Sequence, residues 1–242
     1  MSLAFESSLS AFSLVPYKNC IFQCKYCYLA DIFGESFGRD IEPNLKLSEE
    51  IRKRKYSLQT ESWILSAHTD PYPPIEKKYE VTKNALLELK IIMPKFGIII
   101  TKSPLVLRDI DIIKDFGDNV MVGFSIGSDR QDIIDTFENG APAVQKRFEA
   151  AKKLKESGVK VRILVSPLML HTDDFVHKIK EVADSVYLEI DPEETWADFG
   201  VPADRANFDY NTKEFVEKLR MVFQDDKLII GRKSLASGGV AR

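Results

Sequence analysis

The amino-acid sequence predicts an α/β fold with parallel strands. Short apolar or β-branched runs alternate with longer segments whose apolar residues recur at helical spacing, and about six such strand-then-helix units follow one another. The 242 residues, 44% hydrophobic and 29% charged, can bury a large core without a linker that would mark a boundary. We therefore expect a single domain over residues 1–242, with a core over about 12–191 and a C-terminal helix and tail over 192–242.

The elements can be predicted in order along the chain. The expected strands cover 12–16, 63–65, 97–101, 120–126, 159–165 and 186–190, and 227–230 is a candidate last strand. Helical spacing is clearest from Val144 to Leu154, where an apolar stripe runs toward Gly158 as the expected stop. The other expected helices cover 81–89, 107–116, 175–183 and 212–223.

In barrels and open sheets of parallel strands, the chemistry lies at the carboxyl ends of the strands. The segments that follow the predicted strands are therefore the candidates for a site. They are the loop at 19–28 and the stretches 66–72, 101–103, 125–129, 166–171 and 189–191.

The sharpest feature is a loop that holds the only three cysteines, Cys20, Cys24 and Cys27, within eight residues. An odd number packed so closely does not form a disulfide framework, whereas it suits metal thiolates. Three thiolates can hold three irons of a four-iron cluster and leave the fourth iron open.

Two alternatives to an iron–sulfur cluster stay open from the residues alone. A zinc site would need four ligands, and the histidines at 68, 171 and 177 lie outside any local spacing with the cysteines. The cysteines could also be small apolar fillers, although Lys18, Gln23 and Lys25 make the loop polar.

The C-x3-C-x2-C spacing, with Tyr26 before the last cysteine, resembles the signature of the radical S-adenosylmethionine (SAM) superfamily. The similarity extends over residues 13–183 and looks like the branch that includes spore photoproduct lyase, often labelled DNA-repair-photolyase-like. The segments that carry it are 16–20, 69–72 with Glu76, 101–103, 108–109 and 124–126.

The resemblance implies a partial (β/α)6 TIM-type barrel, a [4Fe-4S] cluster and SAM bound at the open iron. Reductive cleavage of SAM would give a 5′-deoxyadenosyl radical that abstracts a hydrogen atom from an unidentified substrate. A reductant such as ferredoxin or flavodoxin would then be a partner.

The resemblance also implies roles for five residues around SAM. Lys102 would face the carboxylate of SAM, and Ser125 would bond the same methionine moiety, although Lys102 could be an exposed loop lysine. Thr69 and Asp70 would lie near the amino group, with a rigid turn as the equal alternative for Asp70. Tyr26 would place its backbone near the adenine.

Other polar residues are candidates with structural alternatives. His68 and His171 follow predicted strands and are catalytic candidates for proton transfer, or structural hydrogen-bonders. Glu138 and Arg147, with Pro142, resemble a family pattern, but a helix-start acid and a surface arginine would also explain them. Glu189 and Asp191 could contact a cationic or hydroxylated substrate or cap a loop.

The sequence also limits what the protein acts on and where. Spore photoproduct lyase uses a further cysteine as a hydrogen-atom donor, and Ala67 stands at that place here, so we expect a different reaction. The net charge of −3 gives no support for nucleic acid binding without excluding it. With no apolar run of membrane-spanning length and no signal peptide, we expect a cytoplasmic monomer. An iron–sulfur electron-transfer or sensing protein and a DNA-lesion-directed lyase-like enzyme are the alternative functions.

Overall fold

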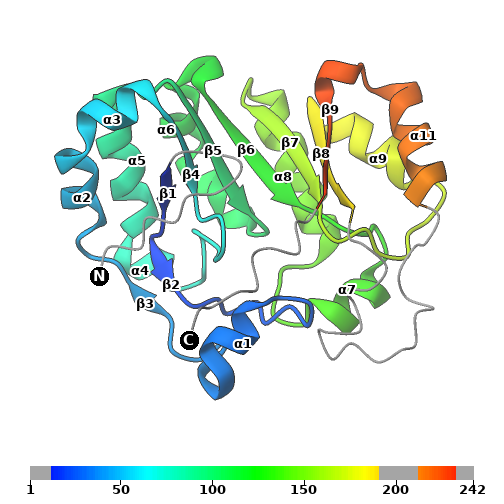
Figure 1. Ribbon diagram of the computed structural model, residues 1–242, viewed down its shortest axis with the longest axis horizontal. Coiled ribbons are helices and arrows are strands. Elements are labelled where there is room, and N and C mark those ends of the chain that lie inside the picture. Colours follow the sequence, from blue (N-terminus) through cyan, green and yellow to red (C-terminus); the bar gives the residue numbers. More distant parts are fainter. Residues whose placement is uncertain (1–11, 191–211, 233–242) are drawn as a thin grey trace.

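The structure is a computed structural model in which residues 12–190 and 212–232 are described. Its centre is a sheet of seven strands, all parallel to their neighbours, that forms an open half-barrel (Figure 1). In sheet order the strands are β1 (Phe12–Leu14), β4 (Ser62–Leu65), β5 (Phe96–Thr101), β6 (Val120–Ser125), β7 (Lys160–Val165), β8 (Ser185–Ile190) and β9 (Leu228–Arg232). The predicted α/β class and partial TIM-type barrel are confirmed.

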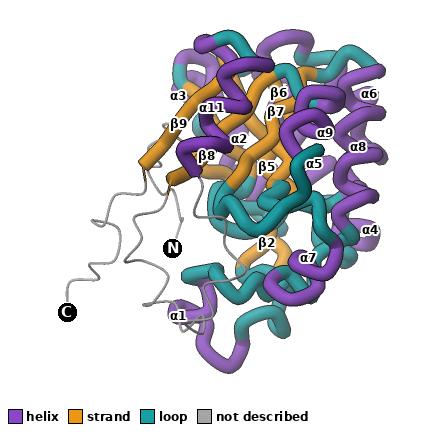
Figure 2. The backbone as a smooth tube through the Cα atoms, turned by 90° about the vertical axis from the view of Figure 1, so that its right-hand side faces the viewer, coloured by secondary structure: helices purple, strands orange, loops and turns teal. Residues whose placement is uncertain are grey.

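Most of the helices lie on one face of this sheet (Figure 2). They are α2 (Leu47–Lys53), α3 (Lys55–Thr60), α4 (Glu76–Tyr79), α5 (Val81–Ile92), α6 (Ile110–Lys114), α8 (Val144–Glu156), α9 (Phe175–Val182) and α11 (Thr212–Val222). Every second residue of a strand faces them, as Val161, Ile163 and Val165 of β7 do in the main core. Burying each such side chain stabilises the fold by about 1.5–3 kcal/mol. The opposite face of the sheet is the inner face of the half-barrel.

Helix α8 shows why the periodic segments fold as predicted. Val144, Phe148 and Leu154 of its apolar stripe are buried against the sheet. Gly158 follows with a φ of +90°, a conformation that disfavours other residues and ends the helix.

Two details differ from the expected elements. The segment expected as one helix over 107–116 is a 3-10 helix, Pro104–Asp109, followed by α6, because Pro104 and the Ser103 side chain, which accepts from Leu105 N at 3.3 Å, start the first turn. The first strand ends at Leu14, and the chain then forms β2 (Tyr17–Lys18), antiparallel to β3 (Glu42–Pro43). The remaining 3-10 turns are Gly34–Ser36, Gly117–Asn119 and Asp225–Lys227.

The carboxyl ends of the strands share one edge of the sheet, lower in Figure 1. Strand β2 leads there into the cysteine loop and α1 (Leu29–Phe33), and α7 (Gln131–Phe137) lies at the same edge. None of the helices in the described ranges is long and apolar enough to cross a membrane.

Candidate active site at the carboxyl edge of the sheet

The cysteine loop is shaped by Asn19. Its backbone has a φ of +67°, a left-handed conformation that asparagine adopts more readily than most residues. Its side chain donates to the carbonyl of Ser36 at 2.7 Å and accepts from the amides of Cys20 at 2.7 Å and Gly38 at 3.2 Å. The Asn19 side chain thus joins the start of the cysteine loop at Cys20 to the segment at Ser36 and Gly38.

A second anchor joins the loop to the segment after α7. Lys25 N donates to the carbonyl of Phe137 at 2.8 Å, and Gly140 N donates to the carbonyl of Phe22 at 3.2 Å. A Cβ at Gly140 would lie 2.6 Å from the carbonyl oxygen of Ile21, so only glycine allows this close approach.

The three cysteines lie in this anchored loop as free thiols, with Cys24 buried and Cys20 and Cys27 half-buried. Cys27 N donates to the carbonyl of Cys24 at 3.0 Å, which closes a tight turn between the last two. Burial raises the pKa of Cys24 to about 12, and the nearby Lys102 ammonium opposes the rise. Among the described residues, no three metal-binding side chains surround one common point. A four-iron cluster held by these three cysteines would have one thiolate on each of three irons and leave the fourth iron open.

Lys102 is the centre of a polar group beside this loop. Its ammonium donates to Ser125 Oγ at 2.6 Å and to Tyr26 Oη at 3.2 Å, and lies 3.1 Å from Glu138 Oε1. Burial is the largest influence and favours the neutral amine, but the Glu138 carboxylate and the Cys24 thiolate together outweigh it and raise the pKa of Lys102. Only 12% of the side chain is exposed, so Lys102 is not an exposed loop lysine, and the structure brings it together with Tyr26 and Ser125.

Glu138 and Arg147 complete the group, and the interpretation of Arg147 as a surface residue is wrong. Arg147 is fully buried at the first turns of α8, where its Nη1 pairs with Glu138 Oε2 and its Nε donates to the carbonyl of Pro142 at 2.7 Å. Glu138 also accepts from Tyr26 Oη. Burial opposes ionisation of Glu138, but Lys102 and Arg147 hold its pKa at about 2. The spacing of Glu138, Pro142 and Arg147 was the sequence signal for this pair.

Asp70 links two strand ends within the same region. Its buried carboxylate accepts from Tyr72 N at 2.8 Å, from Thr101 Oγ1 at 2.8 Å and from Lys102 N at 2.7 Å. Burial raises the pKa of Asp70, and these hydrogen bonds limit the rise. Its neighbour Thr69 donates to the carbonyl of Tyr17 at 2.9 Å. Both side chains therefore make the contacts of a structural turn, and that turn fixes the position of Lys102.

A second network of ion pairs and hydrogen bonds holds the chain just before the cysteine loop. Arg108 donates to Asp109 at 2.7 and 2.8 Å and to Glu76 Oε1 at 2.5 Å, while Glu76 accepts from Tyr17 Oη at 2.5 Å. Tyr17 lies just before the cysteine loop, so these ion pairs fix the start of the loop against the helix layer.

The two histidines have separate surroundings. His68 Nδ1 shares a hydrogen bond with Tyr28 Oη, the residue after Cys27, and burial lowers the pKa of His68. His171 packs between Phe175 and Phe215, with ring centroids 5.2 and 5.0 Å away. The described contacts place His68 beside the cysteine loop and His171 among the aromatic side chains of α9 and α11.

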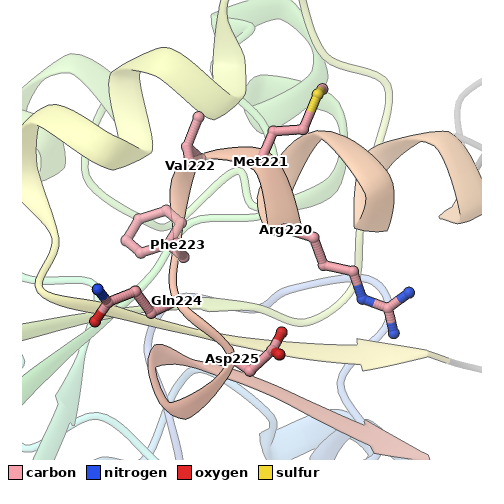
Figure 3. Close-up of a pocket in the computed structure, with 6 residues that line it drawn as sticks. All are labelled: Arg220, Met221, Val222, Phe223, Gln224 and Asp225. Carbon is pink, nitrogen blue, oxygen red and sulfur yellow. The ribbon is translucent and has the colours of Figure 1, made fainter.

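A surface hollow lies away from this edge, at the end of α11. It is lined by six consecutive residues, Arg220 to Asp225, whose side chains point in different directions (Figure 3). The polar groups do not converge there, in contrast to those around Lys102.

Fold and site together define a protein of the radical SAM class. The model of the radical SAM superfamily matches residues 14–186, and the chain belongs to that superfamily. An uncharacterized protein from Methanocaldococcus jannaschii is 31% identical over 175 residues, which are 68% of this chain and 63% of that protein. An uncharacterized protein of Acidianus two-tailed virus is 26% identical over 162 residues, 62% of this chain and 53% of the viral protein. The chain thus spans less than two thirds of both relatives.

Solved structures agree on the fold at low identity. A cysteine-to-serine mutant of spore photoproduct lyase superposes with a TM-score of 0.65 at 17% identity, covering 96% of this chain and 80% of the lyase. SuiB of Streptococcus suis bound to S-adenosylmethionine gives a TM-score of 0.62 at 15% identity, covering 92% of this chain and 50% of SuiB.

Proposed function

We propose that this chain is a radical SAM enzyme that binds a [4Fe-4S] cluster through Cys20, Cys24 and Cys27 and SAM beside it. When bound, the reduced cluster supplies the electron that cleaves SAM to methionine and a 5′-deoxyadenosyl radical. The observation that carries the proposal is the convergence of Lys102, Ser125 and Arg147 next to a loop with three thiols.

An unsatisfied buried donor supports the fit to SAM. Arg147 is fully buried, yet its Nη2 has no hydrogen-bond partner among the described residues. A buried donor without a partner costs about 1–3 kcal/mol, which a carboxylate ligand would recover. Lys102 Nζ and Ser125 Oγ, 2.6 Å apart, offer further donors for the same anion.

The residues of the chain would then act in three ways. Asp70 fixes the backbone of Lys102, so that the ammonium stays at the carboxyl end of β5. Glu138 remains ionised between Lys102 and Arg147 and keeps both cations oriented toward the bound methionine carboxylate. The hydrogen bond from Tyr26 Oη to Glu138 fixes Tyr26 in the cysteine loop, where its backbone would lie near the adenine of SAM.

The decisive experiment is anaerobic reconstitution with iron and sulfide, followed by dithionite and SAM. We expect formation of 5′-deoxyadenosine and a change in the EPR signal of the reduced cluster when SAM is added. A fully loaded cluster that gave neither would support the alternative of an electron-transfer or sensing protein.

A lesion-directed lyase reaction is the further alternative, and Ala67 argues against it. The stretch after β4 reads Ser66, Ala67 and His68, and no thiol outside the cluster loop exists in the sequence. Incubating the active enzyme with DNA that contains thymine lesions, with repair followed by chromatography, decides this point. We expect no repair.

The natural reductant is a separate part of the proposal. In place of dithionite, we propose that a ferredoxin or a flavodoxin supplies the electron.

A further inference from the structure

The inner face of the half-barrel is unevenly polar. On β4 and β5 it carries isoleucines, Ile64 and Ile98, which are buried outside the main core. On β7 and β8 the residues between the core-facing valines and leucines include Arg162 and Glu189, two charged side chains. Burying a charged side chain costs free energy unless it is paired, so Arg162 and Glu189 are unexpected on this face if their role is packing alone.

Arg162 differs from the other arginines inside the molecule. Arg108 pairs with Glu76 and Asp109, and Arg147 pairs with Glu138. Arg162 is half-buried, and the only hydrogen bond or ion pair that the described residues give its side chain is the bond from Nε to Ser185 Oγ at 3.0 Å. Burial without a carboxylate lowers the pKa of Arg162. Its terminal nitrogens can therefore take an oxyanion.

Glu189 is the complementary group on the neighbouring strand. It is half-buried near the carboxyl end of β8, and within the described ranges its carboxylate has Ser166 Oγ as its hydrogen-bond partner and no cation. Arg162 lies opposite Ser185 in the sheet, and Glu189 follows four residues later on the same face, about 13 Å along the strand. Glu189 thus lies at the carboxyl edge of the sheet, and Arg162 lies deeper inside the half-barrel. We call the inner-facing residues of β7 and β8 from Arg162 to Glu189 the strip.

The strip faces the same space as the Lys102 group. Leu164, between Arg162 and Ser166, is in register with Ser125 on β6, so Ser125 and the strip share the inner face. We propose that Arg162 and Glu189 form the substrate subsite of this enzyme, for a small zwitterion whose acid group pairs with Arg162 and whose ammonium pairs with Glu189. This inference deepens the proposed function and rests on it.

Simple zwitterions test the subsite without knowledge of the substrate. Binding to the cluster-loaded chain is measured anaerobically by calorimetry for β-alanine, γ-aminobutyrate, ε-aminocaproate and phosphoethanolamine, with butyrate and butylamine as matched single charges. We expect at least one zwitterion to bind saturably, at least tenfold more tightly than either single charge. Preference for an amino carboxylate or for phosphoethanolamine then identifies the acid group.

Variants tie the binding to the two residues. Arg162→Gln and Glu189→Gln should each weaken the zwitterion at least tenfold, whereas Arg130→Gln, on an exposed arginine paired with Asp132, should not. Absence of saturable zwitterion binding to the wild-type chain, or equal binding by the variants, overturns the inference. If Arg162→Gln fails to fold, Glu189→Gln and the wild-type series still decide.

The two proposals fail in different ways. Loss of the proposed function appears as no 5′-deoxyadenosine from the wild-type chain. Loss of this inference appears as normal cleavage of SAM by a wild-type chain that does not bind any of the zwitterions.

Discussion

Glu138 lies between two buried cations, the Lys102 ammonium and the Arg147 guanidinium. Glu138→Gln would leave both cations without a counter-charge, and breaking one buried pair in this way costs about 3 kcal/mol or more. We expect a loss of that size in the free energy of unfolding of the apo chain, measured with urea at pH 7. Glu149→Gln, on the exposed side of α8, should change it by less than about 0.5 kcal/mol.

The same residue predicts a dependence on pH. Because the pKa of Glu138 is held at about 2, below the ordinary carboxyl value, its contribution is fully present above about pH 4.5 and is lost as the pH falls toward 2. The difference in unfolding free energy between the wild type and Glu138→Gln should therefore shrink over this window. A difference that stayed constant from pH 6 to pH 3 would contradict the assignment of an ionised Glu138.

Lys102 gives the direct test of SAM recognition. Removing a charge-assisted hydrogen bond costs about 1.5–3 kcal/mol, so Lys102→Ala should raise the Kd for SAM by about tenfold or more while iron content stays unchanged. Calorimetry and iron analysis measure the two effects. Lys114→Ala, at an exposed position, is the matched control, and an unchanged Kd for Lys102→Ala would remove this lysine from the site.

At the scale of elements, the cysteine loop depends on its contact with the segment after α7. A Cβ on residue 140 would meet the carbonyl oxygens of Ile21 at 2.6 Å and Phe22 at 2.8 Å, and backbone atoms cannot easily move apart. Gly140→Ala should therefore displace the loop and at least halve the iron retained after reconstitution and desalting. Asn139→Ala, next to it and exposed, should retain wild-type iron.

At the scale of the whole molecule, we expect the sheet and its helix layer to form without help from the cysteine loop. The main core joins strands β4 to β8 to α5, α8, α9 and α11, and none of the three cysteines belongs to it. Removing iron with a chelator should lower the Tm and leave the far-ultraviolet circular dichroism nearly unchanged. Collapse of that spectrum would mean that the cluster organises the sheet as well. Cys24→Ser, tested without chelator, serves as the comparison.

The periodic elements could be predicted because their pattern is local. The stripe of α8 and the alternation of β7 appear in the sequence as they appear in the structure. The two-residue strands β2 and β3 could not be predicted, because strands this short carry no pattern and depend on a partner about 25 residues away.

The candidate site was predicted only where its residues form a local pattern in the sequence. The cysteine spacing and the strand-end positions of Lys102 and Ser125 are visible along the chain. For Arg147 the sequence left a family pattern and a surface position open, because the burial of an arginine depends on a carboxylate that the fold, and not the neighbouring sequence, brings to it.

By itself, then, the sequence determined the fold class, the order of the elements and the loop with three thiols, since each rests on spacing within one segment. Only the tertiary structure decided which polar side chains meet. The buried Glu138 lies between Lys102 and Arg147, and Arg162 lies on the inner face of the sheet without a carboxylate. Charge pairing inside a protein acts over a few ångströms in space, and those distances are set by how the strands pack side by side.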